Sequence, residues 1–442
     1  MTAMTHYYLH HYFIPDFNHK RLRPVAMVDG NVDAHYLGYV QNVVAGQVLA
    51  ELVTFAELPQ GASHSVTAVP AVASTVIPLP NLREGYPEPE DLPLAAERGN
   101  SGHKNVSSAM ESIDTRFLYD APVFPLGPNC ARDPQNPNRI ISLVNGYCFY
   151  HQGLITVKKL LNVRQDISFR TGNITYVGDV VLHGNVFPGF SLYGKNIRVK
   201  GKIDGGTVHA KGDVVVEGGI KGSPKALLEA GATVRLASSE QAKIVTPGNL
   251  IIDGDCIHSR LYVGGSLFVK GRLQGGSVNC GGTVVVKEQL GCNQEAPTSL
   301  ALGHDPLARL RMQWIHERNE EQSNRLQYYA ARARMGAHVA EECAPLVEVA
   351  TRKRAIIQDM QNAALRMFEA ETVTDGKNRL VVPGVVYPGV TVSIGQASRK
   401  IVDEVANVFF SLHEDEIVNG SPAISKGFPS ADGTMDLPDE NT

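Results

Sequence analysis

Short runs in which apolar and polar residues alternate fill the stretch from about Leu161 to Cys292. Alternation with a period of two is typical of β-strands with one buried side. The clearest runs are Ile197–Val199, Val214–Val216, Leu250–Ile252, Leu267–Val269 and Val284–Val286. The pattern predicts many strands of about three to five residues, separated by turns.

Two columns of glycine accompany these runs at intervals of 16 to 19 residues in the first column. The first column consists of Gly178, Gly194, Gly212, Gly231, Gly248, Gly265 and Gly282. The second consists of Gly184, Gly201, Gly218, Gly254 and Gly271, and its place near Ala237 is not glycine. A fixed period predicts a repeat whose units bury their apolar sides against each other. Glycine at the corners permits positive φ and a close approach of the neighbouring backbone. We therefore expect a single-stranded β-helix solenoid over residues 163–292.

An ordinary β-sandwich with glycine turns does not keep two glycine columns in register, so the solenoid is favoured. Left-handed hexapeptide helices need coils close to 18 residues. The variation in coil length here favours a right-handed or irregular helix, and we expect right-handed coils.

After Cys292 the apolar spacing becomes helical, and residues 293–375 predict two helices. Asp305 is the candidate N-cap of the first, with Pro306 in its first turn. The first helix is expected to reach about Glu342, and Ala344–Pro345 to break it. The second carries a heptad seam, from which we take an interaction surface of Leu346, Val349, Ile356, Met360 and Met367. Lys353 interrupts this seam. An inserted antiparallel coiled-coil hairpin is the predicted arrangement.

The segment 382–392 repeats 182–192 at an offset of 200 residues. Gly384 matches Gly184, and Pro388-Gly389 matches Pro188-Gly189. The chain is therefore expected to return to a short β-helix-like coil over 376–419. Gly384 and Gly389 join the structural corner glycines.

The remaining segments differ in composition. Residues 1–58 predict a small β module, 59–115 a linker rich in proline, alanine and serine, and 116–162 a β cap that leads into the solenoid. Residues 420–442 predict a disordered tail. The protein is expected to be mainly β with one helical hairpin.

The formal charge of −4 gives no reason to expect nucleic acid or an anionic membrane as a partner. Six cysteines show no C-x-x-C pair, and no metal or cofactor is expected. No signal-peptide pattern and no run of about 18 apolar residues occurs, so we expect a cytoplasmic protein without a membrane span.

Candidate catalytic residues are few. No phosphate loop, dinucleotide fingerprint, zincin motif or nucleophile elbow is present. His183, His209 and His258 could act as acyltransferase bases, but they fall at different points of the coil, and we interpret them as surface or corner residues. The aspartates that could line a carbohydrate-cleaving groove all lie beside corner glycines, where aspartate is a common turn residue. They are Asp179, Asp204, Asp213, Asp253 and Asp255.

Several motifs resemble the flagellar assembly protein A family, and more distantly the polymer-forming bactofilins. The resemblance covers roughly Phe117 to Val418. It rests on segments 171–174, 178–181 and 184–186, on Gly-Gly coils, on Ile257-His258-Ser259 and on 386–390 with Ile394–Gly395. The family implies a β-helix, a helical hairpin and a short β return. It also implies a non-catalytic cytoplasmic protein of assembly or localisation at the cell pole or flagellum, and it names no catalytic residues.

The function expected from these observations is that of a scaffold or regulatory protein that binds other proteins and forms a homo-oligomer through the hairpin. The alternatives are a β-helix enzyme, either an acyltransferase or carbohydrate-active, and a cytoskeletal polymer. A polymer needs open coil ends, and both ends are expected to be covered.

Overall fold

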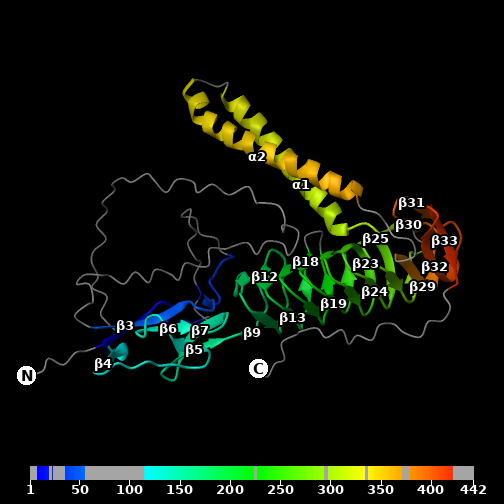
Figure 1. The fold of residues 1–442 in the computed structure, drawn as a ribbon. Coiled ribbons are helices and arrows are strands. Elements are labelled where there is room, and N and C mark those ends of the chain that lie inside the picture. The colour runs from blue at the N-terminus through cyan, green and yellow to red at the C-terminus, as the bar shows by residue number, and fades with distance from the viewer. Residues whose placement is uncertain are drawn as a thin grey trace, which may run out of the picture. The chain divides into compact units, whose positions relative to one another are not determined.

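The computed structural model describes residues 7–18, 22, 35–54, 114–222, 226–292, 297–333, 337–370 and 378–421 (Figure 1). Nearly all of the linker expected at 59–115, and the expected tail beyond Ser421, lie outside these residues. The chain forms two compact units. One contains the described residues up to Gly218, and the other contains those from Gly219 to Ser421.

The first unit begins with a small β-sheet module. Its elements are β1 (Tyr7–His11), β2 (Asn42–Val43), β3 (Val48–Thr54), a 3-10 helix (Thr115–Phe117), β4 (Leu118–Tyr119), β5 (Cys130–Arg132), β6 (Arg139–Ser142), β7 (Gly146–His151) and β8 (Leu154–Lys158). Five strands pair in the order β4-β1-β3-β6-β5, and β2, β7 and β8 form a second sheet. Leu9, Leu49, Ile140 and Ile155 are fully buried in the shared core.

This arrangement differs from the division expected from the sequence. Residues 1–58 and 116–162 were expected to form separate parts, whereas β1 pairs with β4, and β3 pairs with β6. Strands from both segments therefore belong to one sheet. Neither segment alone offers a sheet with both neighbours paired, which is the physical reason for their union.

The solenoid follows, and most of its strands have two to five residues. In the first unit they are β9 (Leu160–Val163), β10 (Ile174–Thr175), β11 (Asp179–Leu182), β12 (Ser191–Gly194), β13 (Ile197–Val199), β14 (Ile203–Asp204), β15 (Thr207–Ala210) and β16 (Val214–Val216). In the second they are β17 (Ile220–Lys221), β18 (Leu227–Ala230), β19 (Val234–Leu236), β20 (Ser239–Glu240), β21 (Lys243–Thr246), β22 (Leu250–Ile252), β23 (Cys256–Val263), β24 (Leu267–Val269), β25 (Arg272–Cys280), β26 (Val284–Val286), β27 (Gln289–Leu290) and β28 (Thr298–Leu302).

Parallel pairing between strands three places apart gives each turn three strands, as in β12–β15 and β13–β16. Where β23 and β25 each run through a corner, the same pairing joins them directly. The result is a parallel β-solenoid of about eight turns, which confirms the mainly β solenoid expected from the sequence. The inward residues form columns of Val, Ile and Leu, such as Leu250, Leu267 and Val284, all fully buried.

The corner glycines serve close approach more than unusual backbone angles. A Cβ on Gly201 would meet the carbonyl oxygen of Gly184, and one on Gly218 would meet that of Gly201. None of these three has a positive φ. By contrast, Gly189 and Gly389 have φ of +83° and +89° with open space around them, so the matching Pro-Gly turns need glycine for its backbone freedom.

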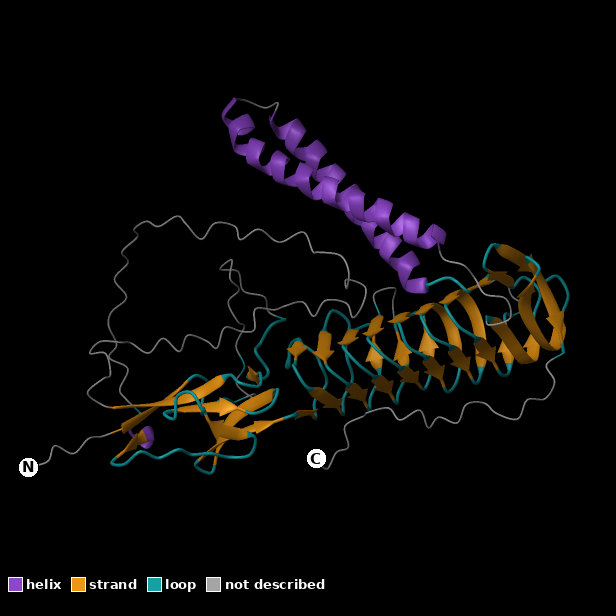
Figure 2. Cartoon of the chain, in the orientation of Figure 1, coloured by secondary structure: helices purple, strands orange, loops and turns teal. Residues whose placement is uncertain are grey.

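The helices are α1 (Pro306–Ala333) and α2 (Ala337–Ala370), which run side by side (Figure 2). The Asp305 carboxylate accepts a hydrogen bond from the Leu307 N–H at 2.9 Å, which confirms Asp305 as the N-cap. The expected break at Ala344–Pro345 is wrong, because Pro345 lies inside α2. Proline removes one backbone hydrogen bond there, but a helix packed along its length tolerates this loss. The coiled-coil supercoil and the right-handed coils remain predictions.

The chain re-enters the solenoid after the helices. The returning strands are β29 (Arg379–Val386), β30 (Thr391–Ile394), β31 (Ala397–Lys400), β32 (Val405–His413) and β33 (Glu416–Gly420). Strand β29 pairs in parallel with β26 and β27, and β30 with β28. The pairing then becomes antiparallel, with β31 on β30 and β32 on β29. These antiparallel strands cover the last coil.

The first coil is covered by residues that precede it in the module. The Asn42 side chain donates to the Thr175 carbonyl at 2.7 Å and accepts from the Val177 N–H at 3.2 Å. The His35 carbonyl accepts from the Asn173 N–H at 2.6 Å. These bonds replace those of a preceding coil along β10, which has a paired strand on its other side.

Candidate functional site

Polar side chains at the solenoid corners bind the backbone of the next coil. The Asn196 side chain accepts a hydrogen bond from the Asp213 N–H at 3.0 Å and donates one to Asp179 at 3.0 Å. Asn249 accepts from the Ser266 N–H at 2.8 Å, and Asp255 accepts from the Arg272 N–H at 2.9 Å. Asparagine and aspartate therefore act as structural ladders at these corners.

Charged side chains on the outer surface pair with charges about one coil away. Arg235 contacts Asp253 at 2.7 Å, and Lys270 contacts the same carboxylate. Burial raises the pKa of Asp253, but the hydrogen bonds from Arg235 and Lys270 outweigh burial and hold it below the ordinary value. The Arg272 guanidinium likewise lowers the pKa of Asp255. Carboxylates engaged in this way are poorly suited to acid–base catalysis, which requires a pKa near the working pH.

The three solenoid histidines do not come together. His183 follows β11 on the exposed surface, and His209 stacks on Tyr193 with ring centroids 4.7 Å apart. His258 is exposed at a corner within β23. Among the residues that the structure describes, no group of three His, Cys, Asp or Glu side chains is placed to hold a metal ion.

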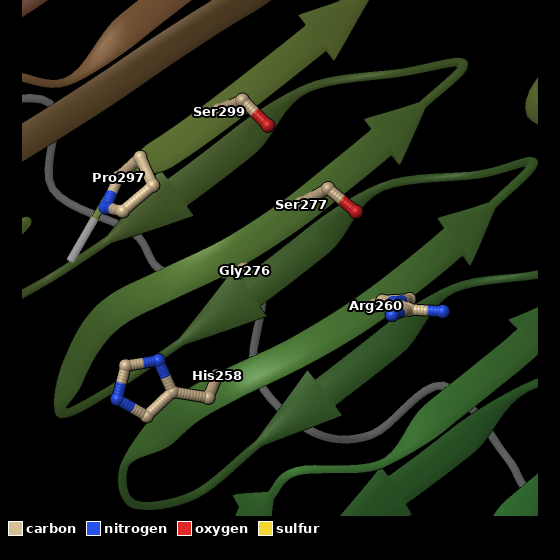
Figure 3. A pocket seen from close by; sticks show the side chains of 6 residues that line it. All are labelled: His258, Arg260, Gly276, Ser277, Pro297 and Ser299. Atoms are coloured by element: carbon tan, nitrogen blue, oxygen red, sulfur yellow. The ribbon is translucent and has the colours of Figure 1, made fainter. Parts of the chain in front are cut away.

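His258 lies at one end of a groove of about 390 Å³ across three strands. The groove is lined by His258, Arg260, Gly276, Ser277, Pro297 and Ser299. Figure 3 shows Arg260, Ser277 and Ser299 on successive strands, with their side chains on the same side of the sheet. The register explains this row, because Arg260 pairs with Ser277, and Ser277 pairs with Ser299.

The backbone at the His258 end of the groove is tightly fixed. His258 has a φ of +48°, and Gly275 and Gly276 have φ of +63° and +79°. A Cβ on Gly275 would collide with the His258 ring, so that ring lies directly against the Gly275 backbone. The Gly275 N–H donates to the buried hydroxyl of Thr298 at 2.9 Å. The groove is therefore a rigid feature of the solenoid surface.

The polar groups of the groove differ from those of the ladders, because they are free. Within the part of the chain that the structure describes, Arg260, His258, Ser277 and Ser299 form no side-chain hydrogen bond or ion pair. No carboxylate lines the groove. It therefore presents one permanent positive charge, one imidazole and two hydroxyls to solvent.

The base of α1 packs on the same side of the sheet. Tyr262 lies two residues after Arg260 on β23 and so faces the same way. It packs with Val245 against Leu307 and Leu310 of α1. The groove therefore lies on the solenoid face to which the helices are attached.

The predicted interaction surface lies on α2, where the structure divides its apolar residues between two sides. Cys343, Ala350 and Ile357 are buried, at a spacing of seven residues that forms one line along the helix. Leu346, Val349 and Ile356 are 46%, 39% and 41% exposed. Met360 and Met367 also belong to α2, and their side chains lie outside the described part.

Sequence reasoning named His258 but did not find its neighbours in the groove. Arg260 and Ser277 are 17 residues apart, so the coil period alone could have placed them side by side. Ser299 is 22 residues beyond Ser277, and the period gives no reason to add it. The residue-by-residue strand pairing is needed for this part of the site.

The fold and its surfaces define a class: a parallel β-solenoid that carries a helical insertion before its last coil and has no evident catalytic constellation among the described residues. Residues 159–417 match the family model described as Flagellar Assembly Protein A beta solenoid domain. The chain belongs to this family, as its glycine pattern predicts. No curated protein and no solved structure gives a match. No helix in the described part is long and apolar enough to cross a membrane.

Proposed function

We propose that this protein is a non-catalytic cytoplasmic scaffold or regulator, which acts through protein–protein contacts in flagellar assembly or polar localisation. We further propose that two copies associate through the stripe of Leu346, Val349 and Ile356 on α2. Family membership supports a role related to flagellar assembly. The exposure of this apolar stripe is the observation that carries the association.

The position of the stripe supports contact with a second copy. Val349 is one residue from the buried Ala350, and so lies about 100° around the helix from the packed side. Glu348, Arg352 and Arg354 lie nearby and are exposed, so the stripe is bordered by both signs of charge. In a two-fold arrangement each copy of such a border can face opposite charges on the other. The stripe itself would exclude water from the centre of the contact.

Light scattering across concentration tests the association. The variant L346E/V349E/I356E places three carboxylates in the stripe, and we expect it to remain monomeric at concentrations where the native chain forms a discrete oligomer. The control T351E/R354E changes the formal charge by the same amount at exposed positions of α2 and should keep the native oligomer. Deletion of residues 305–370 with a short linker should abolish the oligomer as well.

An oligomer that survives both the triple substitution and the deletion would exclude the hairpin as the association element. Growth into long polymers would instead favour the cytoskeletal alternative. The cover on both solenoid ends, through Asn42 on β10 and the antiparallel β31 and β32, argues against end-to-end polymers.

A further inference from the structure

The groove over β23, β25 and β28 is the part of the solenoid surface where an arginine lacks the carboxylate that neighbouring arginines have. Arg235 and Arg272 each bind an aspartate on an adjacent coil. Arg260 lies between these two in the sequence, and its register partner in the next coil is Ser277. In this unit the solenoid neutralises Arg235 and Arg272 and leaves Arg260 uncompensated.

We propose that this groove binds an acidic segment of a partner protein, with a carboxylate on Arg260 and further oxygen contacts to Ser277, Ser299 and His258. Guanidinium and carboxylate form the strongest common pair of hydrogen-bonding groups in proteins. Hydroxyls and imidazole can donate to the same ligand. All four donors are free among the described residues, so binding breaks no bond seen between them.

The shape of the groove favours an extended segment over a small anion. Arg260, Ser277 and Ser299 lie in a row on three strands, so the row covers two strand spacings, or about 10 Å. Alternate side chains of an extended peptide are about 7 Å apart, which allows two acidic residues to contact one row. An isolated phosphate would instead require donors that converge on one point, in a more enclosed site.

The charge of the whole chain makes the contact local. The formal charge is −4, so the protein has no general attraction for polyanions. An acidic peptide that binds must therefore find a positive site, and Arg260 can be tested as that site. The proposal rests on the proposed function only in taking the ligand to be a protein.

The test is a fluorescence anisotropy titration of the full chain with fluorescein-labelled hexaglutamate at low and at physiological salt. We expect saturable binding that weakens at least tenfold in R260Q and severalfold in S277A/S299A. The matched control is R272Q, which removes one positive charge from an exposed arginine on the adjacent β25 and should change the affinity by less than twofold. Circular dichroism verifies that each variant is folded.

Three results would overturn the proposal: no saturable binding to the native chain, equal weakening in R260Q and R272Q, or binding of inorganic phosphate without binding of the peptide. The hairpin is intact in every variant. Failure here therefore leaves the proposed association through α2 standing, and failure of that association leaves this binding experiment unaffected.

Discussion

The outer strand carrying Arg235 and the strands beneath the groove are built from the same repeat, yet they treat polar side chains differently. Near Arg235, a charge finds its partner on the adjacent coil, and Asp253 binds two cations. In the groove, Arg260 finds Ser277, and Ser277 finds Ser299. Because the register fixes which side chains meet, an unpartnered charge is a property of the whole column.

The difference separates stability from recognition. A side chain bonded to the next coil contributes to the stack and is not available for a ligand. A free donor on a rigid strand contributes little to the stack and is available for a partner. Substitutions in the two kinds of place should therefore have opposite profiles, with loss of stability in the first and loss of binding in the second.

The largest loss of stability is expected from G201A. The new Cβ would collide with the Gly184 carbonyl and the Asn185 side chain of the coil below, and both are held by the ladder. We expect a loss of about 3 kcal/mol or more in the free energy of unfolding, measured by urea denaturation. The control G189A meets no atom, but has a φ of +83°, and should cost about 1–2 kcal/mol. A smaller effect in G201A than in G189A would mean that the coils can move apart.

A second large effect is expected inside the N-terminal module, where the buried Nε2 of His11 has no hydrogen-bond partner among the described residues. Burial, with a smaller contribution from His10, lowers the pKa of His11 to about 4. The unfolded chain, with an ordinary imidazole, binds more protons between about pH 6.5 and 4. Stability of the module should therefore fall as the pH decreases through this window, by up to about 3 kcal/mol.

Calorimetry from pH 7 to pH 4 measures this dependence. H11F keeps an aromatic ring beside Phe13, Phe117 and Tyr150 and should flatten the pH profile of the module. H10Q, the neighbouring substitution, should leave most of the slope in place. An unchanged slope in H11F would assign the titration to another group.

The smallest of the three effects concerns a ladder side chain. N196A removes the acceptor of the Asp213 N–H and the donor to Asp179, at a position only 8% exposed. We expect a loss of about 2 kcal/mol in the free energy of unfolding. N249A removes a bond from an exposed side chain and should cost under about 1 kcal/mol, because water can replace it. Equal losses would show that burial does not control the contribution of these ladders.

The period of the glycines was sufficient to predict the solenoid, because each glycine answers a contact one coil away. The Pro-Gly repeat at an offset of 200 likewise predicted the return of the chain, and β29 does pair with β26. The end of the first helix was wrong because Pro345 was taken as a stronger break than Gly336. The cost of one proline is local, whereas helix packing acts over the whole length of α2.

Pairings across long or irregular stretches could not be predicted. Strand β28 was assigned to the helical segment, since the coil before it is five residues longer than the period and contains no glycine of the first column. Ser299 was lost from the groove for the same reason. In the module, β1 and β4 are separated by about a hundred residues, and no local pattern reports their pairing. The stripe on α2, by comparison, follows from helical spacing alone.

The place of the helices within the chain has a consequence for synthesis on the ribosome. Coils up to β28 can stack as they emerge, but β29 follows roughly 75 residues later. At 5–20 residues per second, the upper edge of the nascent solenoid stays unpaired for roughly 4–15 s. During this delay the nascent strand edge is exposed to pairing with other chains, and the translation rate of the helical segment sets how long the hazard lasts.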